Sequence, residues 1–188
     1  MKIKKVTVFG TGNFGARVAF HTAFNRIDVT VYDRDYSLLE EARTKFREFA
    51  DTYVKDFGAT QEEVETALAN IAYSMDITEA AGNADLIIEA LPEDLSVKKK
   101  FYTELQKTAP KDAIFASTSA GLDPVELSEA SGRVDKFVNF HFPVDMDPAG
   151  TSEIICLPTI DSTIVETITQ FAEELEMQVI VRKMEQQD

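Results

Sequence analysis

Short apolar runs alternate with longer stretches of helical periodicity along almost the whole chain. The runs rich in Val, Ile and Phe predict β-strands, and they cover residues 5–10, 27–33, 71–74, 84–91, 113–119, 136–142, 152–158 and 178–183. The stretches between them predict helices over residues 12–24, 36–57, 60–68, 96–107, 123–130 and 161–177. This alternation is typical of a mainly parallel sheet with helices on both faces. We therefore expect a doubly wound α/β fold, one domain over residues 1–188, with ligands at the carboxyl ends of its strands.

The ends of two predicted helices carry recognisable capping residues. Ser37 is the expected N-cap of the helix over residues 36–57, because Glu40 follows three residues later, and Gly58 is expected to end that helix. Asp123 and Pro124 predict the start of the helix over residues 123–130.

Composition and charge exclude several classes of partner. The net charge of −14 argues against nucleic acid, because phosphate binding needs clustered Lys and Arg. The one basic cluster, residues 98–100, is interpreted as a solvated helix face, with Lys98 considered separately below. No apolar run approaches the ~20 residues that span a bilayer, and the start of the chain lacks the pattern of a signal peptide. The single cysteine, Cys156, excludes an internal disulfide framework and is expected to be a core thiol. We expect a cytoplasmic protein with no membrane partner and no metal site.

Three glycines follow the first predicted strand. The G-x-G-x-x-G pattern alone is a weak signal, but here it lies between a strand and a helix, and Asp33 ends the second strand 18 residues after Gly15. Gly10 permits a tight turn, Gly12 lets the backbone approach a pyrophosphate, and Gly15 lets the helix pack closely on the sheet. The helix N-terminus offers N–H groups to the phosphates. We therefore expect a Rossmann-type fold whose cofactor loop consists of Gly10, Thr11, Gly12, Asn13, Phe14 and Gly15.

Asp33 indicates which dinucleotide is bound. Its carboxylate can accept hydrogen bonds from both hydroxyls of the adenosine ribose and would repel a 2′-phosphate. NAD is therefore the expected cofactor, although Arg34 beside it leaves NADP as the alternative.

The later strand ends carry more specific segments. They read ADLIIEALPEDLSVKKKFY, AIFASTSAGLDPVEL and DKFVNFHFPVDMDPAGTSEIICLP, in that order. Together with the glycine segment, they resemble the 3-hydroxyacyl-CoA dehydrogenase family over nearly the whole chain. The resemblance implies NAD-dependent oxidation of (S)-3-hydroxyacyl-CoA to 3-oxoacyl-CoA, a reaction of fatty acid metabolism. It also implies that Glu93 and Lys98 lie near the nicotinamide half of the cofactor, although each residue alone could be a solvated charge.

The same resemblance implies a catalytic pair. His141 matches the family's base, and Glu153, 12 residues later, matches the residue that orients it. Imidazole, whose ordinary pKa is about 6.5, can take the hydroxyl proton of a secondary alcohol at neutral pH as hydride leaves carbon. A carboxylate on the other ring nitrogen fixes the tautomer and stabilises the imidazolium. The second histidine, His21, lies inside a predicted helix and is expected either to serve packing or to be exposed.

The chain departs from the family at several positions. Residues 117–122 read STSAGL where the family usually has SNTSSL, so Thr118 replaces an asparagine and Ala120 replaces a serine; Val144 replaces a further polar residue. The site is therefore poorer in polar contacts, so either the substrate differs or catalysis is weak or lost.

The chain also stops at Asp188, where family members continue into a helical domain. We expect that C-terminal helical domain to be absent, whether the chain is a fragment, a truncated reading frame or half of a split enzyme. The expected protein partners are a second copy in a homodimer or the missing helical domain.

Two other functions stay open. One is a non-catalytic NAD-binding module, which the missing domain and the altered contacts favour. The other is a dehydrogenase of a smaller hydroxy acid, which the lost polar contacts would suit.

Overall fold

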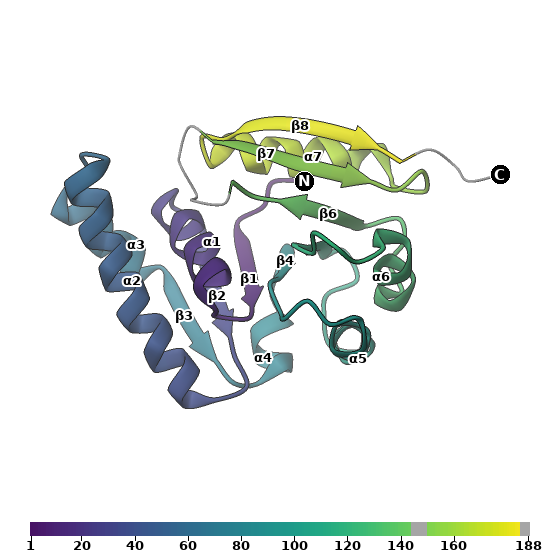
Figure 1. Cartoon of the computed structure of the whole chain (residues 1–188), viewed down its shortest axis with the longest axis horizontal. Coiled ribbons are helices and arrows are strands. Elements are labelled where there is room, and N and C mark those ends of the chain that lie inside the picture. Colours follow the sequence, from purple (N-terminus) through teal and green to yellow (C-terminus); the bar gives the residue numbers. More distant parts are fainter. Residues whose placement is uncertain (144–149, 185–188) are drawn as a thin grey trace.

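The sheet of this protein confirms the predicted architecture. The structure is a computed structural model that describes residues 1–143 and 150–184. Its strands lie in the order β3-β2-β1-β4-β5-β6-β7-β8 (Figure 1). Their bounds are β1 Lys5–Phe9, β2 Asp28–Tyr32, β3 Ile71–Ser74, β4 Leu86–Glu89, β5 Ile114–Ser117, β6 Phe137–His141, β7 Thr151–Cys156 and β8 Gln178–Lys183. Neighbouring strands are parallel except for β6 and β7. The strand order reverses between β1 and β4, which is where ligands bind in such sheets.

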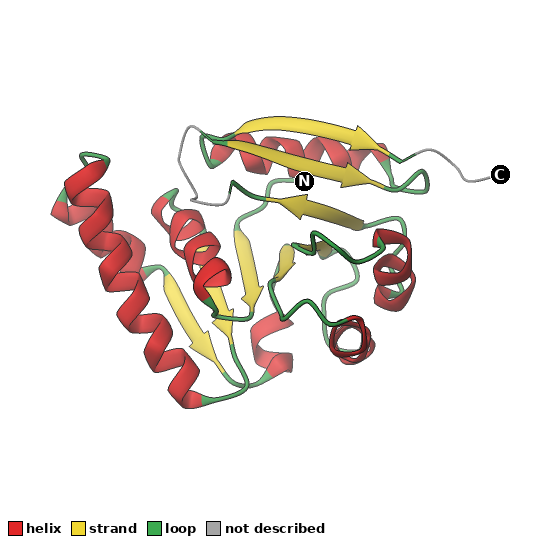
Figure 2. Ribbon diagram, viewed as in Figure 1, coloured by secondary structure: helices red, strands yellow, loops and turns green. Residues whose placement is uncertain are grey.

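Helices cover both faces of the sheet (Figure 2). Their bounds are α1 Asn13–Phe24, α2 Tyr36–Asp56, α3 Gln61–Ala69, α4 Ile77–Ala81, α5 Leu95–Leu105, α6 Pro124–Ser131 and α7 Ser162–Glu174. One apolar cluster joins the sheet to α1, α2, α3 and α7, and a second cluster joins it to α4, α5 and α6. The doubly wound prediction is therefore confirmed. Helix α4 was not predicted, because five residues show no helical period.

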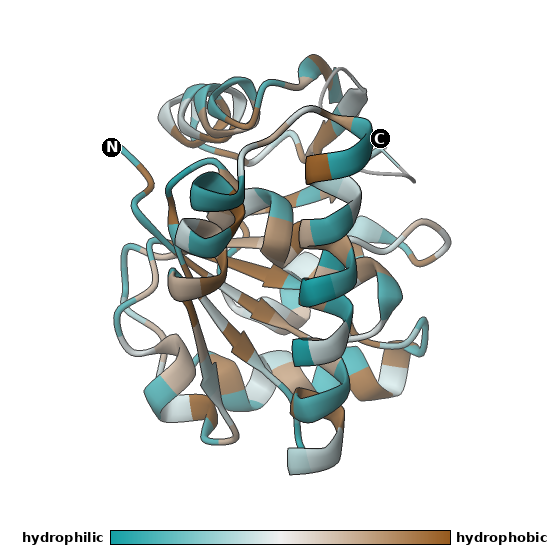
Figure 3. Cartoon of the chain, turned by 90° about the vertical axis from the view of Figure 1, so that its left-hand side faces the viewer, coloured by the Kyte–Doolittle hydropathy of each residue, from teal (hydrophilic) through white to brown (hydrophobic). Residues whose placement is uncertain are grey.

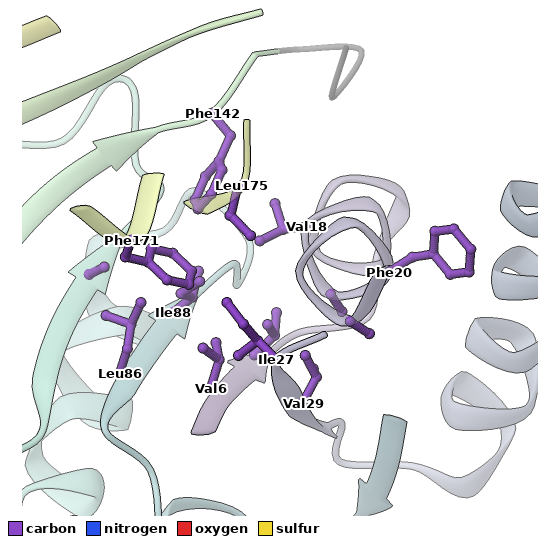
Figure 4. Packing of buried hydrophobic residues seen from close by; sticks show 14 of the residues in the cluster. Val6, Val18, Phe20, Ile27, Val29, Leu86, Ile88, Phe142, Phe171 and Leu175 are labelled. Carbon is purple, nitrogen blue, oxygen red and sulfur yellow. The ribbon is translucent and has the colours of Figure 1, made fainter. Parts of the chain in front are cut away.

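The central strands β1, β4, β5 and β6 are buried on both faces, which explains their nearly continuous apolar sequences. In β4, Leu86 and Ile88 pack into the first cluster, and Ile87 between them packs into the second. Figure 4 shows Leu86 and Ile88 beside Val6 of β1, with Phe171 of α7 over them. Burying one such side chain contributes about 1.5–3 kcal/mol. Figure 3 shows the complementary pattern, with hydrophilic positions along the outer turns of the helices.

The helix caps agree with the sequence in one case and differ in another. Asp123 caps α6 and Pro124 occupies its first turn, as predicted. Ser37 does not cap α2; the N-cap is Asp35, whose carboxylate accepts a hydrogen bond from the Ser37 amide. The prediction was wrong because the chain already enters the helix at Tyr36. Gly58, with φ of +72°, follows the end of α2 in the left-handed conformation that favours glycine.

Candidate cofactor cleft and active site

The glycine segment packs against the end of β4 at the point where strand order reverses. A Cβ on Gly10, whose φ is +100°, would lie 2.5 Å from the carbonyl oxygen of Ala90. A Cβ on Gly15 would lie 2.0 Å from the carbonyl oxygen of Gly10 and 3.1 Å from the Ala90 side chain. Both positions therefore require glycine, because backbone atoms occupy the space that a side chain would need.

Gly12 differs from these two glycines, because a Cβ there would meet nothing within 4 Å. It precedes α1, whose N-terminus carries no side-chain cap. The other six helices of the described residues are all capped by an aspartate or threonine side chain. The first N–H groups of α1 therefore face outward beside open space, which fits a phosphate group.

These residues line a cleft of about 520 Å³. The glycine segment forms one wall, and residues 90–92 after β4 form another. Asp33 also lines the cleft, and its Oδ2 accepts hydrogen bonds from the Thr11 amide at 2.9 Å and the Thr11 hydroxyl at 2.7 Å. Its Oδ1 accepts one from the Arg34 amide at 2.9 Å. A carboxylate offers about four lone-pair sites, so Asp33 retains capacity for a ribose hydroxyl. The chemistry and shape of the cleft thus fit a dinucleotide.

His141 and Glu153 meet across the only antiparallel strand pair of the described sheet. They are direct partners in the β6–β7 register, and His141 Nδ1 lies 3.5 Å from Glu153 Oε2. The spacing of 12 residues seen in the sequence therefore brings Glu153 back to the position opposite the histidine. The other oxygen of Glu153 pairs with the guanidinium of Arg182 on β8. Both side chains of the His141–Glu153 pair are 28% exposed.

The second ring nitrogen of His141 also faces an acceptor. Nε2 lies 2.8 Å from the carbonyl oxygen of Ser119, which follows β5. A neutral imidazole can donate to only one of its two partners, whereas the protonated ring can donate to both. Asn139 donates to the same carbonyl oxygen at 2.9 Å, while its own Oδ1 is buried without a hydrogen-bond partner. The carbonyl of Ser119, just after β5, thus contacts two side chains of β6, those of Asn139 and His141.

Glu93 and Lys98 form a network of ion pairs and hydrogen bonds that joins Glu89 to the loop containing Ser119. Lys98 Nζ lies 3.1 Å from Glu93 Oε2 and 3.0 Å from Glu89 Oε1. Glu93 Oε1 accepts hydrogen bonds from the Ser119 hydroxyl at 2.6 Å and the Gly121 amide at 2.8 Å. Partial burial raises the pKa of Glu93, but these two hydrogen bonds and the charge of Lys98 outweigh that effect and lower the pKa to about 2. Glu93 is therefore ionised at any physiological pH.

Of the two interpretations of Lys98 from the sequence, the structure excludes the solvated charge, and its place near the nicotinamide stays a prediction. Its side chain is 1% exposed, whereas Lys99 on the same helix is 46% exposed. The sequence analysis gave Glu89 no role, yet its side chain is fully buried. One signal was present, since Glu89 is the only charged residue in the apolar run from Leu86 to Leu91.

The remaining sequence predictions concern two residues expected in the core and two positions that depart from the family. His21 and Cys156 are buried in the core, and His21 bonds to the Tyr53 hydroxyl and the Leu175 carbonyl, which confirms a packing role. Ala120 is exposed in the loop after β5. Val144 lies outside the described residues. None of the helices in residues 1–143 and 150–184 combines the length and hydropathy needed to cross a bilayer.

Comparison with known families and sequences gives a consistent result. Residues 5–185 match the model of the 3-hydroxyacyl-CoA dehydrogenase NAD-binding domain. The mitochondrial hydroxyacyl-coenzyme A dehydrogenase of Homo sapiens is 29% identical over 178 residues, which is 92% of this chain and 57% of that protein. A probable 3-hydroxybutyryl-CoA dehydrogenase of Bacillus subtilis is 25% identical over 155 residues, 82% of this chain and 53% of that protein. The chain thus spans little more than half the length of these relatives.

A solved structure of a diketoreductase, described as acting on dicarbonyl compounds, is also similar. It superimposes with a TM-score of 0.95 and is 37% identical, covering 99% of this chain and 66% of that one. This identity exceeds that of the two enzymes named above for CoA thioesters.

Proposed function

The chain belongs to the 3-hydroxyacyl-CoA dehydrogenase family, of which it is the NAD-binding domain, and from this premise we propose that it interconverts a 3-hydroxy compound and the matching 3-oxo compound. The observation that carries this proposal is the contact between His141 and Glu153 at the same sheet edge as the glycine segment. Strands β1 and β6 are three strand spacings apart, about 14 Å. A dinucleotide extended along this edge would bring its nicotinamide toward the histidine.

His141 is the proposed proton-transfer residue. In the oxidation direction the neutral ring takes the proton of the substrate hydroxyl at Nε2, once that hydroxyl replaces the Ser119 carbonyl as the partner of Nε2, and in the reduction direction the protonated ring returns the proton to the forming alkoxide. Glu153 accepts from Nδ1–H, which holds the ring orientation and leaves Nε2 as the nitrogen that exchanges the proton. NAD, when bound, supplies the hydride acceptor.

The proposed cofactor residues follow the cleft. The amides of Asn13, Phe14 and Gly15 lie at the uncapped N-terminus of α1, where they would donate to the pyrophosphate. Thr11 is held in place by Asp33, which would accept from the adenosine ribose. Glu93, whose side chain is 45% exposed, is the proposed contact with the nicotinamide end of the cofactor. The buried ammonium group of Lys98 holds Glu93 in place through their ion pair.

We propose (S)-3-hydroxyacyl-CoA as the first substrate candidate, from the family match. A free dicarbonyl or small hydroxy acid is the second candidate, and the 37% identity to the diketoreductase favours it.

One kinetic experiment tests both candidates. Oxidation of NADH is followed with acetoacetyl-CoA and, separately, with an unesterified diketone, using the chain and His141→Ala. Turnover that disappears in His141→Ala supports the enzyme, and the preferred substrate separates the two candidates. Turnover equal in both proteins would refute the role of His141. Tight NADH binding without turnover in either protein would favour a non-catalytic NAD-binding module.

A further inference from the structure

A lysine buried at the start of α5 is energetically unusual. Lys98 lies in the first turn of this helix, four residues after its N-cap Asp94, where the helix dipole disfavours a positive charge. Its side chain is 1% exposed, so the ammonium group has also lost its hydration. Two carboxylates compensate, Glu89 at 3.0 Å and Glu93 at 3.1 Å. Such a costly arrangement calls for an explanation beyond the packing of α5.

Glu89 anchors one end of this arrangement to the sheet. Its Oε1 accepts from the Leu91 amide at 2.7 Å, in addition to Lys98. Its Oε2 accepts from the Ser117 hydroxyl at 2.7 Å and the Tyr102 hydroxyl at 3.3 Å. Both oxygens of this fully buried carboxylate are therefore saturated by donors from the segment after β4, from β5 and from α5. A carboxylate held in this way gives Lys98 a fixed point to bind.

The other end of the arrangement leads to the histidine. Lys98 holds Oε2 of Glu93, and Oε1 of Glu93 holds both the hydroxyl of Ser119 and the amide of Gly121. These contacts fix the loop that follows β5. The carbonyl of Ser119, in that loop, receives Nε2 of His141. An unbroken series of contacts thus runs from Glu89 through Lys98, Glu93 and Ser119 to the ring of His141.

We propose that Glu89 and Lys98 are positioning residues for His141. They hold Glu93, which sets the loop carbonyl against Nε2, while Glu153 holds Nδ1 from the opposite side. In this account the ammonium group of Lys98 acts on His141 through the two carboxylates. The inference rests on the proposed function, in which His141 transfers the proton.

The ring signals of the two histidines provide a direct test. Nitrogen-15 NMR of the full chain, recorded without cofactor or substrate, reports the tautomer and environment of each ring. His21 serves as an internal reference, because it is buried between Tyr53 and Leu175 and is not a member of this contact series. Lys98→Met alone would leave the buried carboxylate of Glu89 without a counter-charge, so the main variant is Glu89→Gln/Lys98→Met. Lys99→Met is the matched control, because within residues 1–143 and 150–184 the ion-pair partner of Lys99 is the half-exposed Glu126 on α6.

The proposal predicts that the ring signals of His141 shift in Glu89→Gln/Lys98→Met and that those of His21 stay unchanged. Lys99→Met should move neither. Unchanged His141 signals in the folded double variant would overturn the proposal, and so would equal shifts at both histidines, which indicate general loosening. If the double variant does not fold, Glu93→Gln, at a half-exposed position, must shift His141 alone. Because no turnover is measured, this outcome is independent of the kinetic test above.

Discussion

Substitution by alanine should have different effects at Gly12 and at Gly15 of the cofactor loop. Gly15→Ala would place a Cβ 2.0 Å from the Gly10 carbonyl oxygen, whereas Gly12→Ala would place one in open space. The backbone of Gly12, with φ of −58° and ψ of 179°, is one that alanine adopts without strain. Gly15→Ala should therefore damage the fold, and Gly12→Ala should damage only the cofactor site.

The expected sizes follow from the contacts. A Cβ at 2.0 Å lies more than 1 Å inside ordinary contact distance, so the backbone of α1 or of the loop must shift. Overpacking of this kind costs about 3 kcal/mol, which lowers Tm by about 6–12 °C in a domain of this size. For Gly12→Ala we expect a change in Tm below about 3 °C. A methyl group between the helix N-terminus and the pyrophosphate should weaken NADH binding at least about tenfold, or about 1.4 kcal/mol.

Thermal unfolding and NADH fluorescence titration of the two variants measure these effects. The reasoning is refuted if Gly12→Ala binds NADH like the parent chain, because the open face of Gly12 would then not be the phosphate site. A Gly15→Ala protein with unchanged Tm would show instead that the packing of α1 on the loop is softer than the contacts imply.

Three further predictions concern charge. Asp33→Asn should reduce the preference for NADH over NADPH, and equal dissociation constants of the parent chain for both would contradict the role of Asp33. Glu153→Gln should lower turnover at least about tenfold, with the exposed Glu173→Gln as the neutral control. Burial lowers the pKa of His21 from its ordinary value of 6.5. As the pH falls, His21 of the unfolded chain therefore takes up a proton at a higher pH than His21 of the folded chain. The free energy of unfolding, measured in urea, should therefore fall as pH drops below 6.5, and less so in His21→Gln.

The glycine segment shows how much of the fold the sequence could predict. Its spacing, its place between an apolar run and a helix, and the acid after the next strand all follow from local rules, and the structure agrees at each point. Helix α4 escaped prediction because it is too short to show a period. The N-cap of α2 was misplaced by two residues, since Asp35 and Ser37 are both good caps and only the path of the chain decides between them.

Site residues could be predicted where their spacing along the sequence identifies them. They could not be predicted where their role depends on which side chains the fold buries. His141 and Glu153 could be paired by their spacing and family resemblance, and the antiparallel register brings them into contact. The environment of Lys98 could not be predicted, because three consecutive lysines look alike in sequence and only the packing of α5 on the sheet buries the first of them. The partners of Arg182 and Ser119 likewise depend on which strands become neighbours.

The most direct test of the central claim is an NMR titration of the nitrogen-15-labelled chain with NADH. The account predicts that the backbone amides of Asn13, Phe14 and Gly15 shift most, together with the ring signals of His141. Shifts confined to other surfaces, or none at saturating NADH, would contradict the claim that this cleft holds the dinucleotide with its reactive ring toward His141.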